Sequence, residues 1–127
     1  MTSSNTKNTI LFVDDDESCH FLVDLMISDS DEFELLKAFN GQDAISLAKK
    51  YRNRICLVLA DIMLPDISGY ELLKMFVHDN SLRKVPFLFQ SGLPHEEAQQ
   101  YASYDNVNII LKPYKKEELL SSIHKLI

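Results

Sequence analysis

Carboxylates follow two short apolar runs of the sequence. Asp14 and Asp15 come directly after residues 10–13 (ILFV), and Asp61 follows residues 55–60 (ICLVLA). Runs of this kind are typical of buried parallel strands, whose carboxyl ends meet at one edge of the sheet. Two carboxylates about 4 Å apart repel by roughly 4 kcal/mol at an effective dielectric near 20. Three at one edge need a cation, a shared proton or separation, and a divalent metal with oxygen ligands is the simplest resolution.

Two later apolar runs end in groups that suit phosphate chemistry. Ser91 and Lys112 each follow such a run in the second half of the chain. A hydroxyl and an ammonium at the same sheet edge can hold phosphoryl oxygens. With Asp61 as the phosphoryl acceptor and Asp14 and Asp15 at the metal, the set would act by positioning and by charge neutralisation.

The elements that must position these residues alternate along the chain. Strands are expected at residues 9–13, 33–38, 55–60, 87–90 and 107–111. Segments with the apolar period of an amphipathic helix lie at 18–28, 42–51, 69–77, 94–102 and 115–127, and the pattern at 94–102 is the weakest. Five strands alternating with five helices predict one α/β domain, a doubly wound parallel sheet with helices on both faces.

Length and composition agree with a single globular domain. The 127 residues are 46% hydrophobic and 25% charged, enough for one core and too few for two ordinary domains. The net charge of −6 argues against a nucleic-acid surface. The polar start at residues 2–8 has no secretory pattern. Cys19 and Cys56 fall in a predicted helix and strand, which favours buried free thiols and a cytoplasmic location.

These residues, in this order, resemble the receiver domain of two-component response regulators. The resemblance runs from about Thr9 to Ile127 and depends on five segments taken together. They are residues 10–16 (ILFVDDD), 38–44 (AFNGQDA), 61–70 (DIMLPDISGY), 86–92 (PFLFQSG) and 111–114 (LKPY). The resemblance implies a flavodoxin-like, five-stranded parallel sheet of order 2-1-3-4-5 flanked by five helices. It also implies a receiver domain over 9–127, and the polar composition of the residues before it predicts a flexible N-terminus over 1–8.

The resemblance also implies roles for the site residues. Asp61 would accept a phosphoryl group from a phosphohistidine of a histidine kinase or phosphotransfer protein, while Ser91 and Lys112 would contact that group. The expected Mg²⁺ ligands are Asp14, Asp15, Asp61 and the Met63 backbone carbonyl. Lys112–Pro113 is expected to be a cis peptide. The chain would be a phosphoacceptor switch rather than an enzyme. Its output would pass to another protein through the fourth helix, fifth strand and fifth helix, with no nucleic-acid or membrane partner.

The chain departs from the family pattern at the fifth strand. The position three before Lys112 is Ile109, where the family has an aromatic residue that rotates inward on phosphorylation, so that part of the switch is not expected here. The positions two after Asp61 and two after Ser91 are Met63 and Leu93. Because both are bulky and apolar, we expect them to shield an acyl phosphate from water.

Two alternatives compete with this interpretation. One is an interaction module on the same fold that works without phosphorylation. The other is a phosphatase similar to haloacid dehalogenases, with Asp14 as nucleophile and Asp16 as general acid. The simpler interpretation of Asp16 and Glu17 is a helix N-terminus, where negative charge is favourable.

Overall fold

The computed structural model describes residues 8–92 and 106–127. Within them a five-stranded parallel sheet has the order β2-β1-β3-β4-β5. The strands are β1 (Asn8–Val13), β2 (Phe33–Ala38), β3 (Ile55–Asp61), β4 (Phe87–Ser91) and β5 (Val107–Leu111). The helices are α1 (Glu17–Ser28), α2 (Gly41–Lys50), α3 (Gly69–Val77) and α5 (Lys116–Leu126). The predicted sheet order is therefore confirmed.

The strand register brings the predicted site residues to one edge of the sheet. The last aligned pairs are Val13 with Ala60, Asp61 with Gln90, and Ser91 with Leu111. Asp14 and Lys112 directly follow β1 and β5, so they project from the same edge. Strand ends adjacent in space, rather than in sequence, assemble the site.

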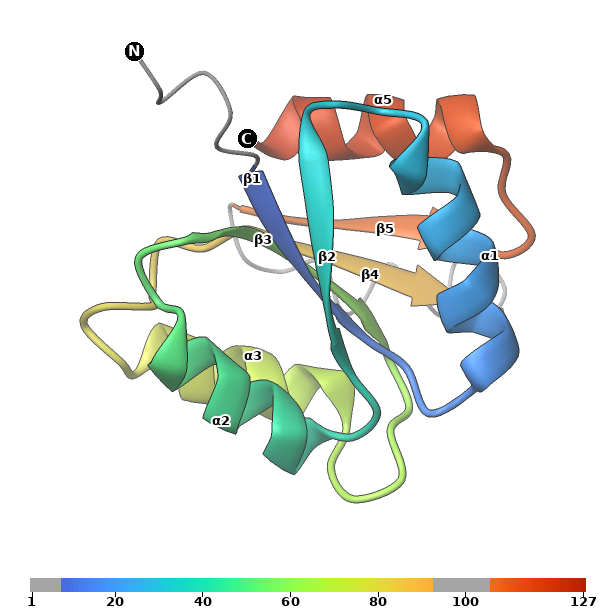
Figure 1. Cartoon of the computed structure of the whole chain (residues 1–127). Helices are drawn as coiled ribbons and strands as arrows, with labels where there is room; N and C mark the ends of the chain where they lie inside the picture. The colour runs from blue at the N-terminus through green and yellow to red at the C-terminus, as the bar shows by residue number, and fades with distance from the viewer. Residues whose placement is uncertain (1–7, 93–105) are drawn as a thin grey trace, which may run out of the picture.

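The sheet separates two apolar cores (Figure 1). Helices α1 and α5 cover one face, and α2 and α3 cover the other. On the α2–α3 side, the Phe76 and Phe87 rings meet edge to face, with centroids 5.0 Å apart. On the α1–α5 side, Phe12, Val23 and Ile123 are buried. Because the central strands are covered on both faces, their side chains are apolar without alternation, as the sequence shows.

Three helices begin at side chains that cap their free N–H groups. Asp16 accepts a hydrogen bond from the Ser18 N–H at 2.8 Å, and Asn40 accepts one from the Asp43 N–H at 2.8 Å. Ser68 and Glu71 form a capping box at the start of α3. The interpretation of Asp16 as part of a helix N-terminus is confirmed.

The helix count differs from the prediction. The described residues contain four α-helices, whereas five were predicted, and the expected helix over 94–102 lies outside them. The expected flexible N-terminus also lies outside them except for Asn8, which begins β1. Cys19 and Cys56 are free thiols and half-buried, because both lie at the borders of the core. No helix of the described segments is long and apolar enough to cross a membrane.

Candidate functional site

Asp14 is a buried carboxylate with three donors around it. Its side chain is 1% exposed. Oδ1 accepts a hydrogen bond from the Asp16 N–H at 3.0 Å, and Oδ2 accepts one from Gln90 Nε2 at 2.6 Å. The Lys112 ammonium lies 3.7 Å from the same Oδ2. A buried charge is tolerated only with such partners, so this part of the site is built around the negative charge of Asp14.

Lys112 joins the ends of β1, β3 and β5. Its Nζ donates a hydrogen bond to Asp61 Oδ2 at 3.1 Å, in addition to its contact with Asp14. Burial by itself would lower the pKa of Lys112, but the charge and hydrogen bond of Asp61, together with the charge of Asp14, contribute in the opposite direction, and the net shift of the pKa is upward. The lysine therefore stays protonated and neutralises part of the charge of both carboxylates.

Of the two carboxylates that Lys112 contacts, Asp61 is the one that solvent can reach. Its side chain is 21% exposed, against 1% for Asp14. Oδ1 faces the Met63 N–H at 3.5 Å, and the Met63 side chain is 73% exposed. Of the two carboxylates held by Lys112, only Asp61 is accessible to an incoming group.

Two other predicted site residues, Ser91 and Asp15, lie at or just after the ends of β4 and β1. Ser91 is the last residue of β4 and is buried, and its carbonyl accepts a hydrogen bond from the Lys112 N–H at 2.8 Å. Asp15 is exposed at the start of the loop that leads to α1. The Lys112–Pro113 bond is cis, as expected. The structure thus brings Asp14, Asp61 and Lys112 into direct contact.

The loop after Asp61 is fixed at both ends. Met63 and Ser68 form an isolated antiparallel bridge, and the Gly69 N–H donates to the Ile62 carbonyl at 2.6 Å. A Cβ at Gly69 would lie 2.6 Å from the Asp61 carbonyl oxygen and 2.9 Å from the Phe89 ring. Only glycine allows α3 to start this close to the backbone of Asp61.

Asp66 ties the same loop to α2. Its carboxylate accepts hydrogen bonds from the N–H groups of Gly41 and Gln42 at 2.8 and 2.9 Å. The hydrogen bond from Gly41 is the largest reason why the pKa of Asp66 lies below its ordinary value. Because these are free N–H groups of the first turn of α2, the negative charge is stabilised there.

Two residues that the sequence did not single out also hold Asp14. His20 is buried between the Phe12 and Phe39 rings, and its Nε2 lies 2.8 Å from the Asp14 carbonyl oxygen. Gln90 interrupts the apolar run of β4 with an amide that reaches the Asp14 carboxylate. A polar side chain inside a fully buried strand is the signal that identifies Gln90.

The donor set suits a hard divalent cation. Among residues 8–92 and 106–127, no three His, Cys, Asp or Glu side chains form a group that could enclose a metal ion. Mg²⁺, however, is usually held by only one or two carboxylates together with water and phosphate oxygens. The carboxylates of Asp14 and Asp61 meet that requirement, so the residues present fit Mg²⁺ by their chemistry.

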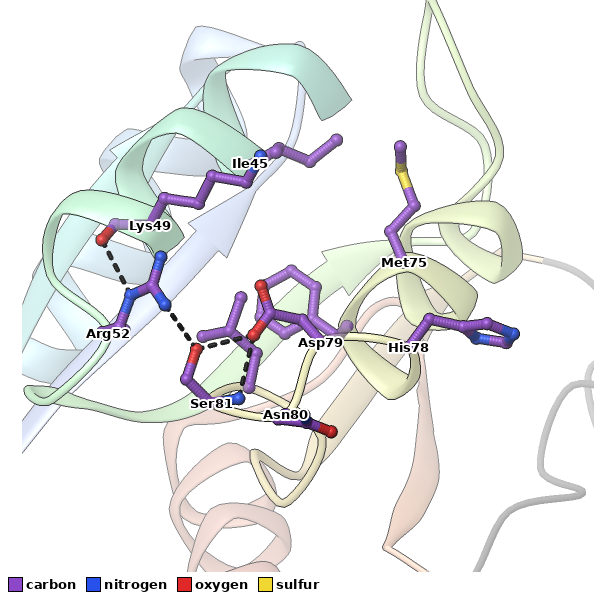
Figure 2. A pocket seen from close by; sticks show the side chains of 10 residues that line it. Ile45, Lys49, Arg52, Met75, His78, Asp79, Asn80 and Ser81 are labelled. Atoms are coloured by element: carbon purple, nitrogen blue, oxygen red, sulfur yellow. Dashed lines mark hydrogen bonds between the residues drawn. The ribbon is translucent and has the colours of Figure 1, made fainter.

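Two cavities differ in their relation to this edge. A cavity of about 660 Å³ opens between α2, α3 and the turn after α3 (Figure 2). Neither Asp14 nor Asp61 lines it. There Arg52 donates to Ser81 Oγ at 2.7 Å and Ser81 donates to Asp79 at 2.6 Å, so these three side chains are paired with one another. A smaller cavity of about 190 Å³ reaches the site itself; its lining includes Cys19, Gln90, Lys112 and Tyr114.

Comparison with known proteins agrees with this geometry. A family model described as the response regulator receiver domain matches residues 10–124. The sequence has no significant match among curated proteins.

Solved structures show the same fold at low sequence identity. The chemotaxis response regulator CheY4 of Vibrio cholerae has a TM-score of 0.85 and 24% identity, over 96% of this chain and 100% of that chain. A response regulator receiver domain protein from Clostridium thermocellum has a TM-score of 0.83 and 19% identity, over 94% of each chain. The receiver domain of a sensor histidine kinase from Pseudomonas aeruginosa, with a magnesium ion coordinated in its active-site cleft, has a TM-score of 0.82 and 20% identity, over 94% and 97%.

Proposed function

The chain belongs to the response regulator receiver domain family of two-component systems, and we propose that it accepts a phosphoryl group on Asp61 from a histidine kinase or phosphotransfer protein. The observation that carries the proposal is the position of Lys112 between Asp61 and Asp14. It leaves an accessible carboxylate beside a fixed ammonium and a buried second carboxylate. That arrangement can neutralise the charge that gathers during phosphoryl transfer.

The transfer would proceed by in-line attack. An Asp61 carboxylate oxygen attacks the phosphorus of a phosphohistidine, an O–P bond forms, and the P–N bond breaks with its electron pair passing to the imidazole. The Lys112 ammonium and the Ser91 hydroxyl then contact oxygens of the transferred group. Mg²⁺, which Asp14, Asp15, Asp61 and the Met63 backbone carbonyl would hold, would supply further positive charge to those oxygens.

A donor protein must approach the edge at which Asp61 lies. Helix α1 begins at this edge, directly after Asp14–Asp16, and exposes Phe21 (65%), Leu22 (53%) and Leu25 (53%). Apolar side chains gathered on one face of a helix are typical of protein–protein contacts. We assign this face of α1 to the phosphodonor, because its position next to the acceptor allows both to be engaged together.

Phosphorylation of Asp61 would act by changing a surface that another protein binds. A phosphoryl group adds nearly two negative charges at the ends of β3 and β4 and attracts the donors around it. We propose that a downstream protein reads the change at the face of the predicted fourth helix, β5 and α5. Ile109 on β5 is half-buried against the α2–α3 core, so no aromatic ring at that position transmits the signal. We assign the domain to residues 9–127, in the cytoplasm, where ATP charges histidine kinases.

The structure does not favour the phosphatase alternative, because neither Asp16 nor Asp14 is free for the role that it requires. Asp16, which would be the general acid, caps α1 through its hydrogen bond from the Ser18 N–H. Asp14, which would be the nucleophile, is buried, accepts two hydrogen bonds and forms an ion pair with Lys112. Of the two carboxylates that Lys112 contacts, the accessible one is Asp61.

Intact mass spectrometry tests the proposal. The wild type and Asp61→Asn are incubated with acetyl phosphate, with and without Mg²⁺, and Asp24→Asn serves as a control at an exposed carboxylate. We expect a Mg²⁺-dependent gain of one phosphoryl group in the wild type and in Asp24→Asn, and none in Asp61→Asn. An adduct that persists in Asp61→Asn would point to Asp14. No adduct with acetyl phosphate or phosphoramidate would favour the phosphorylation-independent module.

A further inference from the structure

A line of three side chains runs from the Asp14 carboxylate to the surface at the β5–α5 junction. Gln90 Nε2 donates to Asp14 Oδ2 at 2.6 Å, and the Tyr114 hydroxyl donates to Gln90 Oε1 at 2.5 Å. The residues come from the end of β1, from β4, and from the segment between β5 and α5. Of the three, only Asp14 has a role in the proposed transfer.

The chemistry of the three groups fixes the orientation of the Gln90 amide. Asp14 is a carboxylate and can only accept, so the NH₂ end of Gln90 must face it. Burial raises the pKa of Tyr114, which keeps the phenol protonated and able to donate to the remaining amide oxygen. The reverse orientation would place an amide oxygen against a buried carboxylate. The Gln90 amide therefore has a defined partner at each end, Asp14 at its NH₂ group and Tyr114 at its oxygen.

Gln90 is a polar side chain at a buried position of β4, where an apolar side chain would serve a purely structural role better. The residue is 1% exposed and follows Phe87, Leu88 and Phe89, which are fully buried. An amide in this place loses its water and is tolerated only when both of its ends are hydrogen-bonded. An apolar side chain would fill the strand without that requirement. What the amide adds is a neutral donor aimed at one oxygen of Asp14.

We propose that Gln90 and Tyr114 are positioning residues for Mg²⁺ binding, with Tyr114 holding the Gln90 amide and the amide holding the Asp14 carboxylate. The inference rests on the proposed function, in which Asp14 is a metal ligand. Partners of this kind orient a ligating carboxylate, and losing them lowers metal affinity about 10- to 100-fold. Because Gln90 is neutral, it orients Asp14 without repelling a cation.

Isothermal titration calorimetry with Mg²⁺ tests the inference on the full chain. The variants are Gln90→Met, which keeps the length but removes both hydrogen bonds, Tyr114→Phe, and the double variant. Matched controls are Gln42→Met on the exposed face of α2 and Tyr51→Phe at the end of α2. Thermal unfolding of each variant is measured in parallel, so that a loss of stability is separated from a change in Kd.

We expect Gln90→Met to weaken Mg²⁺ binding about tenfold and Tyr114→Phe to weaken it less. The double variant should bind no more weakly than Gln90→Met, because Tyr114 acts through Gln90. Both controls should keep the wild-type Kd. Tyr114→Phe removes one hydroxyl from a half-buried ring, so it tests the inference even if Gln90→Met does not fold.

Three results would overturn the inference. Unchanged Kd values in both variants, even with lower melting temperatures, would leave Gln90 and Tyr114 a structural role only. Tighter binding by Gln90→Met would mean that the amide competes with the metal. Additive losses in the double variant would mean that Tyr114 does not act through Gln90. A wild type that binds no Mg²⁺ would instead remove the metal site of the proposed function, and this inference with it.

Discussion

Asp61 and Lys112, 51 residues apart in sequence, are joined by a hydrogen bond of 3.1 Å between Oδ2 and Nζ. The same ammonium lies 3.7 Å from Asp14. One positive charge thus serves two carboxylates before any metal or phosphoryl group arrives. Lys112 therefore occupies oxygen atoms that a cation would seek, while it also provides charge that a phosphoryl group would need.

These two roles predict opposite effects of Lys112→Met. Without the ammonium, the repulsion between Asp14 and Asp61 is no longer offset, and we expect Mg²⁺ to bind about tenfold more tightly, or by roughly 1.4 kcal/mol. Phosphorylation by acetyl phosphate should slow by at least about tenfold, because the transition state loses a cation. Calorimetry and the time course of intact mass measure the two effects. Lys125→Met, at an exposed position of α5, should change neither.

The expected direction for Mg²⁺ distinguishes Lys112 from Gln90. Gln90 donates a hydrogen bond to Asp14, and Lys112 forms an ion pair with it at 3.7 Å, but only the lysine carries a charge that repels a metal. Weaker Mg²⁺ binding by Lys112→Met would show that this lysine mainly orients the carboxylates instead of competing for them.

Met63 is expected to protect the phosphorylated state. Its side chain is 73% exposed, and its N–H faces Asp61. An amide in its place can hold a water molecule near the acyl phosphate, whereas a thioether cannot. We expect Met63→Asn to lose its phosphoryl group about threefold faster, which corresponds to roughly 0.6 kcal/mol.

The decay of the phosphorylated form, followed by intact mass after removal of the donor, measures this effect. Met75→Asn is the matched control, because Met75 is also exposed but lies on α3. Equal rates in Met63→Asn and the wild type would mean that Met63 does not shield the phosphate. The expected partner in shielding, Leu93, lies outside the described residues.

Asp66 should make stability depend on pH in the acid range. Its hydrogen bonds hold the pKa of the folded form below the ordinary value of 3.8. The stabilisation is therefore present above 3.8 and is lost as the pH falls through the lower value of the folded state. Because the carboxylate is exposed and screened by solvent, we expect Asp66→Asn to be less stable at pH 6 by only about 0.5 kcal/mol.

Urea unfolding of the wild type and Asp66→Asn between pH 6 and pH 3 measures this difference. The gap between them should narrow as the pH falls below 3.8, because the wild-type carboxyl begins to be protonated there. A gap that stays constant across the range would mean that the shape of the side chain, and not its charge, holds the loop to α2.

Glycine is required at position 69 but not at position 92. A Cβ at Gly69 would lie 2.6 Å from the Asp61 carbonyl oxygen, whereas a Cβ at Gly92 would have no neighbour within 4 Å among residues 8–92 and 106–127. We expect Gly69→Ala to destabilise the fold by about 2 kcal/mol through overpacking. Gly92→Ala should stay within about 0.5 kcal/mol of the wild type. Urea unfolding compares the two, and equal midpoints would show that α3 can shift away from β3.

Sequence pattern predicted the strands of this fold well. The bounds of β2 and β5 agree with the prediction, and those of β1, β3 and β4 differ by one residue. The reason is that strands covered on both faces are short apolar runs bounded by polar residues. The meeting of Asp14, Asp61 and Lys112 was also predictable, because parallel strands place their carboxyl ends at one edge. The roles assigned to them stay predictions.

Contacts made by side-chain direction were not predictable. The hydrogen bond between Tyr114 and Gln90 spans 24 residues and depends on which way two side chains point at the end of the sheet. The ring of His20 lies between Phe12 and Phe39, which no spacing in the sequence indicates. Cys19 was expected to be buried; it lies at the border of a cavity, where partial burial and the charge of Asp14 raise its pKa to about 11.

The position of β2 at the outer edge of the sheet bears on how this chain behaves in concentrated solution. An edge strand carries backbone groups that a strand of another molecule could pair with. Along β2, Lys37 forms an ion pair with Asp24 at 3.0 Å and Glu34 forms one with Arg54 at 3.5 Å. A second molecule that paired with this edge would have to desolvate these charges. The charged side chains along β2 therefore disfavour aggregation by strand pairing at this edge.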